Sequence, residues 1–372
     1  MGDSFGLESV LWFANDPKDA YEDPTIKRSR SHEYVSKEVK NVRENVGVIE
    51  VANFSKHEFQ GPGARKFLNY VLAGRIPKTG RISLNPMLTP KGKLYGDLTV
   101  ACLNENQFIV FGSGAVQEMH RRWFEKHLKD FNLVYKNRSD DFHGLALSGP
   151  KSRDLLQKLV KENISNENFK FRDVKEMYVA GVPAIVNRIS FTGELGYEIY
   201  VESNHAGPLY DNLTDAGKKF GITQFGVRAL VSMGMEKSFG IWSREFTPDY
   251  TPVMCGMDRF VDYKKTDFIG REAALADRDA EHEHKLVALE VDSEEGDAWG
   301  YEPIWSNGDY AGFVTSGTYG HTVRKSLALG YVKTPYLGVS GYELSVHLVE
   351  GQRPARILSE PPYDPTASKM LG

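Results

Sequence analysis

The pattern of apolar and polar positions indicates both strands and helices. Residues 188–203 read RISFTGELGYEIYVES, in which a glycine-bounded turn at 193–196 opens onto an alternating strand. Tyr197 and the apolar residues two and four positions later take one face of that strand, while Glu198 and Tyr200 take the other. A charged residue in such a strand commonly faces water, so Glu198 either lies on an exposed face or lines a pocket.

Helical spacing and glycine-rich turns mark the other elements. Residues 28–45 read as a polar helix, and residues 225–242 carry apolar side chains at helical spacing. Residues 59–72, FQGPGARKFLNYVL, spell a strand, a tight turn and a helix with proline near its first turn. From Leu286 to about residue 356, short β runs separated by turns predict a small all-β domain.

The strand, turn and helix pattern occurs twice, which indicates an internal duplication. FQGPGARKFLNYVL aligns with LSGPKSRDLLQKLV at 147–160, and GKLYGDLTV at 92–100 then aligns with GELGYEIYV at 193–201. In this alignment Asp97 falls on Glu198. Two copies related by a pseudo-twofold axis would place these two acids in equivalent positions, facing a shared central cleft.

These patterns predict an α+β protein of two duplicated α/β units followed by a β domain. The expected division is an N-terminal extension (1–45), a duplicated region (46–265, with units at about 46–140 and 141–265), a charged linker (266–283) and a C-terminal β-barrel domain (284–372).

Composition restricts the partners of the protein. The 46 Lys and Arg residues nearly balance the 50 Asp and Glu residues, and no basic block suggests a nucleic-acid surface. Cys102 and Cys255 lie far apart, which argues against a disulfide framework and favours a reducing compartment. The sequence lacks a secretory signal and any long apolar run, so we expect a cytoplasmic protein without membrane contact.

Several common sites are missing from the sequence. Residues 112–117, GSGAVQ, begin like a dinucleotide fingerprint but have glutamine at the third glycine position. His282 and His284 lie in a charged connector without a third ligand at useful spacing, so no metal site is expected. HExxH, GxSxG and P-loop motifs are also absent. No nicotinamide or flavin domain is therefore expected in these residues.

The polar residues that remain are Asp97, Glu198 and Arg228, with Phe191 and Tyr197 close in sequence. On the pattern alone, a surface charge or a structural salt bridge explains each of the three charged residues as well as a site does. For Arg228, the structural interpretation is an ion-paired side chain at the edge of the core.

Four segments resemble one known family. SFTGELGYEIYV resembles the (S/Y)xTGExGxEI phrase of the glycine-cleavage T protein family of folate-dependent aminomethyltransferases, and GKLYGDLTV resembles its GGxxDDLxV strand. FGVRALVSMGMEKSFGIW resembles its helix, and TSGTYGHTVRKSLALGYV resembles part of its C-terminal barrel. Within the family the sequence is most similar to the folate-binding half of dimethylglycine and sarcosine dehydrogenases, whose opening phrase resembles Phe5 to Ala14.

The resemblance implies a three-domain aminomethyltransferase-like fold around a central hole that binds tetrahydrofolate. It implies that Asp97 is the catalytic acid beside the reacting folate nitrogen and that Glu198 pairs with the pterin N–H edge. Arg228 would be a polar anchor, and Phe191 and Tyr197 would line the cofactor site. Phe191 stands where the family often has tyrosine, so a hydroxyl contact is lost while ring packing is kept.

The function that the resemblance implies is a one-carbon transferase or demethylase. It would move a methyl or methylene unit from a small N-methylated amine, or a related methyl donor, to tetrahydrofolate. Two alternatives stay open: a folate-binding subunit that works with a flavoprotein dimethylglycine or sarcosine dehydrogenase, and a folate-binding protein without catalysis. The chain would then either act alone or have a flavoprotein dehydrogenase subunit as a possible partner, because oxidising an N-methyl group needs an electron acceptor.

Overall fold

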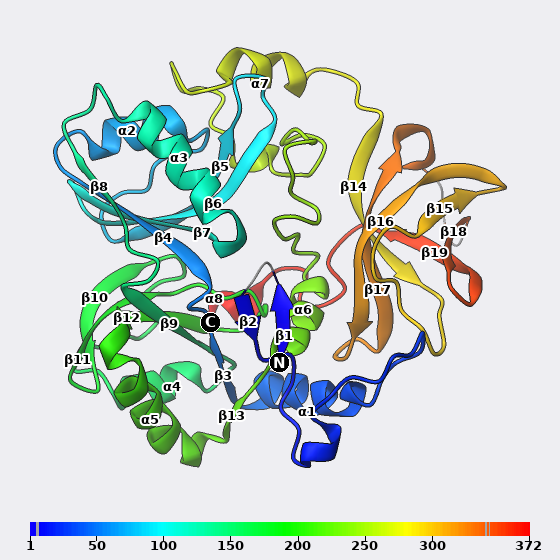
Figure 1. Cartoon of the computed structure of the whole chain (residues 1–372), viewed down its shortest axis with the longest axis horizontal. Helices are drawn as coiled ribbons and strands as arrows, with labels where there is room; N and C mark the ends of the chain where they lie inside the picture. The colour runs from blue at the N-terminus through cyan, green and yellow to red at the C-terminus, as the bar shows by residue number, and fades with distance from the viewer. Residues whose placement is uncertain (5–6, 339–340, 342) are drawn as a thin grey trace.

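A computed structural model describes residues 1–4, 7–338, 341 and 343–372. Over these residues the chain forms three large sheets and one two-stranded sheet, β1 (Gly2–Ser4) with β2 (Leu7–Ser9). Figure 1 shows the large sheets as three lobes, with the first sheet at upper left, the second at lower left and a barrel at right. Mixed helices and strands confirm the predicted α+β class.

The first large sheet has five strands, in the order β5-β6-β7-β4-β8. Two helices cover its outer face, where apolar side chains of both helices pack on alternate residues of β6 such as Leu98 and Val100. The elements are β4 (Phe54–Gln60), α2 (Ala64–Val71), β5 (Arg81–Leu88), β6 (Leu94–Asn104), β7 (Gln107–Ser113), α3 (Gln117–His127) and β8 (Val134–Asn137).

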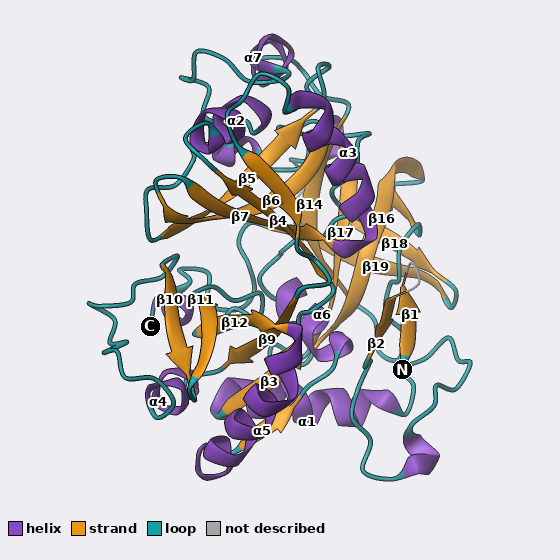
Figure 2. Cartoon of the chain, turned by 60° about the vertical axis from the view of Figure 1, so that its left-hand side comes forward, coloured by secondary structure: helices purple, strands orange, loops and turns teal. Residues whose placement is uncertain are grey.

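The second large sheet has six strands, in the order β10-β11-β12-β9-β3-β13. Helices α4 and α5 cover its outer face and bury a core that includes Leu155, Leu209 and Tyr197. Figure 2 shows the helices on the outside of both sheets. The elements are β3 (Val46–Glu50), β9 (Phe142–Ser148), α4 (Ser152–Gln157), β10 (Val174–Val179), β11 (Val182–Asn187), β12 (Gly196–Glu202), α5 (Ala206–Gly217) and β13 (Ile222–Gln224).

The two sheets repeat one order of elements, as the duplication predicted. The turn before the first helix is alike in both, because Gly61 and Gly149 have φ values of 137° and 129° that favour glycine. A Cβ atom would also collide with backbone in both places, 2.9 Å from the Asn132 oxygen at Gly61 and 2.5 Å from the Asn45 oxygen at Gly149. These glycines therefore serve the same turn in both copies.

The predicted equivalence of Asp97 and Glu198 is wrong. Asp97 lies on β6, which is the second strand of the first sheet and pairs with β5 and β7. The counterpart of β6 in the second sheet is β11, which pairs with β10 and β12. Glu198 lies on β12, whose counterpart is β7. Glu198 pairs with Ala146 of β9, and at the equivalent place in the first sheet Ile109 of β7 pairs with Glu58 of β4. The counterpart of Glu198 is therefore Ile109. The alignment of residues 92–100 with residues 193–201 rested on a short run of similar residue types, and it matched two strands that occupy different positions in their sheets.

The division of the first 50 residues also differs from the prediction. Strand β3 belongs to the second sheet, where it pairs with β9 and β13, and not to the unit of residues 46–140. The polar helix predicted at 28–45 is α1 (Ser31–Glu44), which packs on β3 and on α6 (Val227–Met235). The first 45 residues are therefore part of the packed structure.

A buried ion network fastens α1 to the rest of the fold. The Arg43 guanidinium donates to Glu194 at 3.0 Å and to Glu236 at 2.6 Å. It also donates to Thr322 of the barrel domain at 3.0 Å and lies 3.8 Å from the centre of the Tyr363 ring. One side chain thus joins the first helix, the turn before β12, the end of α6, and the barrel domain.

The C-terminal domain is a closed six-stranded barrel, which confirms the predicted β-barrel. The strands close in the order β14-β17-β16-β15-β18-β19 around apolar side chains such as Leu289 and Val314. Its elements are β14 (His284–Val291), β15 (Pro303–Ser306), β16 (Asp309–Gly320), β17 (Lys325–Lys333), β18 (Leu344–Leu348) and β19 (Gly351–Leu358), with α7 (Arg271–Arg278) before and α8 (Ser368–Leu371) after it.

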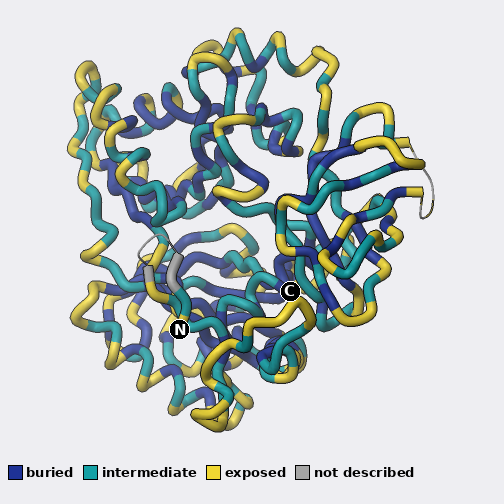
Figure 3. The backbone as a smooth tube through the Cα atoms, turned by 45° about the vertical axis from the view of Figure 1, so that its right-hand side comes forward, coloured by how far each residue is buried: buried dark blue, intermediate teal, exposed yellow. Residues whose placement is uncertain are grey.

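The inner faces of the two sheets meet in a shared core. Phe111 of β7 packs on Tyr200 of β12 with ring centres 4.6 Å apart, and Ala101 and Ile185 belong to the same cluster. Figure 3 shows buried residues toward the interior of the molecule and exposed ones mainly along its outer turns. The region between these two faces, called the inter-sheet space below, is where the candidate acids lie.

Candidate functional site

Asp97 faces the inter-sheet space from β6. Its neighbours Leu98 and Val100 point into the outer core, so Asp97 shares the opposite face with Ala101. The surrounding protein desolvates the carboxyl and raises its pKa to about 7, and only its own backbone N–H lowers that pKa. The residue nevertheless keeps intermediate exposure. Asp97 is therefore enclosed by protein and still reached by water.

Glu198 faces the same space from β12. Desolvation raises the pKa of its carboxyl to about 7, and the Tyr200 hydroxyl partly opposes this by donating to Oε2 at 2.9 Å. Asn187 of the neighbouring strand pairs directly with Glu198 in the sheet. No hydrogen bond joins Glu198 to Asp97 in the part of the chain that the structure describes. The site thus has two separate acids, both near their protonation midpoint at neutral pH.

A long segment of residues 241–257 packs against the barrel. Glu245 fixes it, because this buried carboxyl accepts hydrogen bonds from Ile241 N at 2.9 Å and from Thr315 Oγ1 of β16 at 2.6 Å. Tyr250 stacks on Tyr331 of β17 with ring centres 3.7 Å apart. The segment is therefore held against the barrel.

Cys255 of this segment lies near Asp97. Burial is the main cause that raises the pKa of its thiol to about 12, and the negative charge of Asp97 adds to the effect. A thiol with such a pKa stays protonated at neutral pH and is a poor nucleophile. Cys255 is therefore a weaker candidate than the two acids for chemistry in this space.

Arg228 lies at the start of α6 and is already paired. Its guanidinium forms an ion pair with Glu22, donates to Ser31 Oγ at 2.6 Å and lies 5.0 Å from the Trp12 ring centre. All three partners come from the first 31 residues. The role of Arg228 as a cofactor anchor stays a prediction, and it would require competition with Glu22.

Comparison with known proteins identifies the family. The family model "GCVT N-terminal domain" matches residues 1–265, and "Glycine cleavage T-protein C-terminal barrel domain" matches residues 284–364. The chain belongs to the glycine cleavage T-protein family. This confirms the family that the sequence segments resembled.

Relatives of the chain include dimethylglycine dehydrogenases and aminomethyltransferases. Dimethylglycine dehydrogenase of Mus musculus is 35% identical over 97% of the chain, and that of Homo sapiens is 34% identical over 100%. The chain spans only 42% and 43% of the length of these two relatives. An aminomethyltransferase of Desulfitobacterium hafniense is 31% identical over 81% of the chain and 82% of its own length.

A solved structure has the same fold. The aminomethyltransferase T of Bartonella henselae matches with a TM-score of 0.81 at 22% identity, covering 93% of this chain and 94% of the other. The three-domain aminomethyltransferase-like fold predicted from the sequence is thereby confirmed.

The TGE phrase of the family contains a structural glutamate. Glu194 is 2% exposed and accepts hydrogen bonds from Arg43 and from the Tyr363 hydroxyl. Gly193 has a φ of 81°, and a Cβ atom there would lie 2.7 Å from Lys237. The turn is thus locked from both sides, which fixes the strand that presents Glu198.

Phe191 and Tyr197 flank this turn in different environments. Phe191 is partly exposed and packs on Phe239 at 5.5 Å between ring centres. Tyr197 is 0% exposed and lies in the outer core, where Arg153 donates to its hydroxyl at 3.3 Å. Since strand residues alternate, Tyr197 points away from the face that carries Glu198. Its predicted contact with a cofactor is therefore corrected, and only Phe191 stays a candidate.

Two residues beside Glu198 had no assigned role in the sequence. Tyr200 shares its face by simple alternation, so its hydroxyl could have been assigned to the site from the strand pattern. Asn187 lies 11 positions earlier in a different strand, and only the observed pairing of β11 with β12 brings it to Glu198. Local sequence contains no signal for that contact.

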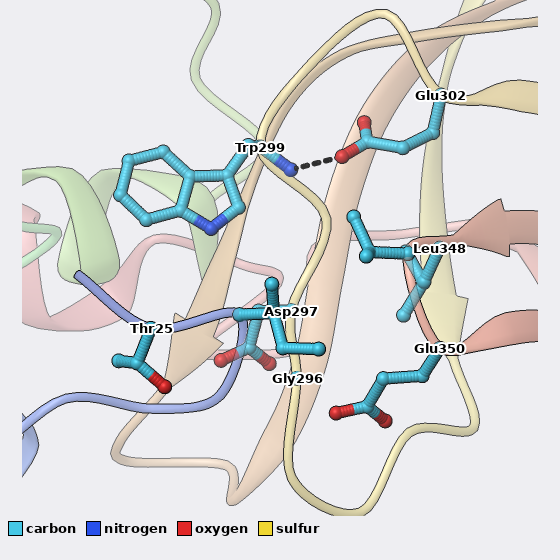
Figure 4. Close-up of a pocket in the computed structure, with 9 residues that line it drawn as sticks. Thr25, Gly296, Asp297, Trp299, Glu302, Leu348 and Glu350 are labelled. Atoms are coloured by element: carbon cyan, nitrogen blue, oxygen red, sulfur yellow. Dashed lines mark hydrogen bonds between the residues drawn. The ribbon is translucent and has the colours of Figure 1, made fainter.

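A small pocket on the barrel domain is a different feature. It has a volume of about 150 Å³, and Figure 4 shows Thr25, Asp297, Glu302 and Glu350 among its lining residues. Two of its acids are paired, since Arg28 pairs with Asp297 at 2.9 Å and the Trp299 backbone N–H donates to Glu302 at 2.8 Å. Pockets that hold a cofactor-sized ligand are about 300–1,000 Å³, so this pocket is too small for one.

Within the described residues, no group of three or more His, Cys, Asp or Glu side chains is arranged to hold a metal ion. Over the same part of the chain, no helix is long and apolar enough to span a membrane.

Proposed function

We propose that the chain is a tetrahydrofolate-dependent one-carbon transferase. It would move a methyl unit from a small N-methylated amine or a related methyl donor to the folate, or a methylene unit once an external electron acceptor has oxidised the N-methyl group. The single observation that carries the proposal is the pair of acids, Asp97 and Glu198, that face one inter-sheet space from two sheets with pKa values raised to about 7. Membership of the glycine cleavage T-protein family supports it.

The residues present fit a folate. The amino-pyrimidinone edge of a pterin carries adjacent N–H donors, and a carboxylate can accept two of them in parallel. Glu198 offers such a carboxylate, with one oxygen already oriented by Tyr200. Apolar and aromatic side chains of both sheets, including Phe111 and Ile185, line the same region. A small number of polar groups in apolar surroundings is the usual composition of a cofactor site.

Asp97 has the properties of the acid–base group. When bound, tetrahydrofolate supplies the nucleophilic nitrogen that receives the one-carbon unit. A pKa near 7 lets Asp97 accept a proton from an amine and return it at neutral pH. The protonated thiol of Cys255 nearby does not compete for this role.

A second candidate is the folate-binding part of a flavoprotein dimethylglycine or sarcosine dehydrogenase. The observation in its favour is that the dimethylglycine dehydrogenases match 97% to 100% of the chain, whereas the bacterial aminomethyltransferase matches 81%. In that case a flavoprotein would oxidise the N-methyl group and this chain would capture the product. The two candidates share the folate site and differ in their need for an electron acceptor.

A transfer assay separates these possibilities. The protein is incubated with tetrahydrofolate and with 13C-methyl-labelled dimethylglycine, sarcosine or a sulfonium donor, and label on the folate is measured by mass spectrometry. We expect transfer that falls at least 100-fold in Asp97→Asn and is unchanged in Glu202→Gln, an exposed acid on the same strand as Glu198. Transfer only with an added flavoprotein dehydrogenase supports the second candidate, and no transfer under either condition contradicts both.

A further inference from the structure

Asn187 has an unusual environment for a polar residue. Its exposed fraction is 0%, and neither its amide nitrogen nor its amide oxygen has a hydrogen-bond partner among the described residues. Burying an amide without partners costs free energy, whereas an apolar side chain of similar size at the same place would not pay that cost. The packing of the fold alone gives no reason for an asparagine here.

Strand pairing places this amide beside Glu198. Strands β11 and β12 are antiparallel, and Asn187 lies directly opposite Glu198 in their register. Directly opposed residues have Cβ atoms about 5 Å apart and project to the same face. The Asn187 amide is close enough to lower the pKa of the Glu198 carboxyl, yet it does not reach hydrogen-bond geometry.

The other neighbours of Glu198 on its own sheet leave one oxygen to be satisfied. Tyr200 donates its hydroxyl to Oε2 at 2.9 Å. On the other side of β12, the residue opposite Glu198 is Ala146, which has no polar side-chain atom. Asn187 is therefore the side chain in register with Glu198 that can donate a second hydrogen bond.

The facing sheet brings the Phe111 ring and the Lys56 amine near this point. Phe111 packs its ring on Tyr200 at 4.6 Å. The buried amine of Lys56 lies 5.9 Å from the Tyr200 ring centre and donates to the Ala52 oxygen at 2.6 Å instead of to a carboxylate. Desolvation, Tyr200 and the amide are the only causes that shift the pKa of Glu198 within the described chain.

We propose that Asn187 is a positioning residue that donates its amide N–H to the ionised Glu198 carboxylate. With Tyr200 on one oxygen and Asn187 on the other, the carboxylate plane is fixed and its outer edge is presented to the inter-sheet space. Burial behind the carboxylate keeps the amide from contacting a ligand itself. The inference deepens the proposed folate site, but the donation to Glu198 does not depend on which ligand is bound.

The first test measures the ionisation of Glu198 without any ligand. The side-chain carboxyl is followed by 13C NMR of glutamate-labelled protein, and its signal is assigned by its loss in Glu198→Gln. We expect Asn187→Leu to raise the Glu198 pKa by about one unit, because a donor to the charged form is lost. Tyr200→Phe is the positive control for the same effect. Ile185→Val, which changes packing at the residue opposite Tyr200, is the negative control.

The second test measures tetrahydrofolate affinity at pH 7 and at pH 9. A rise of the Glu198 pKa from about 7 to about 8 lowers the ionised fraction at pH 7 about fivefold and hardly changes it at pH 9. Asn187→Leu should therefore weaken binding about fivefold at pH 7 and leave it almost unchanged at pH 9.

The results for Asn187→Leu can overturn the role of Asn187 separately from the proposed folate site. An unchanged Glu198 pKa in Asn187→Leu, with a shifted one in Tyr200→Phe, overturns the inference. Equal loss of binding at pH 7 and pH 9 also overturns it, because a merely structural role would not depend on ionisation. A raised Glu198 pKa in a protein that binds no tetrahydrofolate at either pH supports the role of Asn187 and contradicts the folate site.

Discussion

The two site acids should lower the stability of the folded protein above neutral pH. The pKa of Asp97 is raised by desolvation from 3.8 to about 7, so the folded state favours the protonated carboxyl. Between these two values the folded chain holds a proton that the unfolded chain releases. Folding stability therefore falls as pH rises from about 4 to about 7, and it stays low above that.

The magnitude follows from the shift. A rise of about three pKa units corresponds to ~4 kcal/mol as an upper limit, at 1.36 kcal/mol per unit. Because water still reaches Asp97, screening reduces this, and we expect ~2 kcal/mol. Asp97→Asn replaces the carboxyl with a neutral group of nearly the same shape. It should stabilise the protein by that amount at pH 8 and by almost nothing at pH 4.

Thermal unfolding at several pH values tests this expectation. For a chain of this length unfolding as one unit, ~2 kcal/mol corresponds to roughly 3 °C. Asp130→Asn, at an exposed position, gives the background effect of removing one charge. A gain that is equal at pH 4 and pH 8, or a loss of stability at pH 8, would refute the reasoning. The same experiment on Glu198→Gln should give the same sign, since desolvation raises its pKa from 4.5 to about 7.

Three further variants test the supports around the site. Glu194→Gln leaves Arg43 buried with weaker pairing, so it should destabilise the fold by about 3 kcal/mol; denaturant unfolding with less than ~1 kcal/mol lost would show that the network is not structural. Glu22→Gln frees the Arg228 guanidinium and should tighten tetrahydrofolate binding if that residue is an anchor, whereas unchanged titrations argue against anchoring. Glu245→Gln should increase amide hydrogen exchange in residues 241–257 by weakening the bonds to the barrel, and unaltered exchange would contradict that fastening.

The sequence was informative wherever structure is determined by local pattern. Alternation in β12 correctly separated the face of Glu198 from that of Tyr197, and the short β runs after Leu286 correctly predicted the barrel. The glycine turns at Gly61 and Gly149 are equivalent because each needs the same backbone conformation. These features depend on steric rules that act within a few residues.

Features that depend on pairing between distant strands could not be derived. Strand β3 enters the second sheet, and Asn187 lies opposite Glu198, because of how distant strands pair. The local sequence does not encode that pairing. The same limit produced the false equivalence of Asp97 and Glu198. Their common place in the inter-sheet space arises from two sheets packing face to face, and not from a repeated position.

Isothermal titration with tetrahydrofolate at pH 8 tests the central claim most directly, namely that Asp97 and Glu198 belong to one folate site. The account predicts binding by the native protein and by Glu202→Gln, and a loss of about tenfold or more in Glu198→Gln, where a charge-assisted pair is removed. Asp97→Asn should bind but fail to transfer. Equal affinities of the native protein and Glu198→Gln, or no binding by the native protein well above micromolar concentration, would contradict the account.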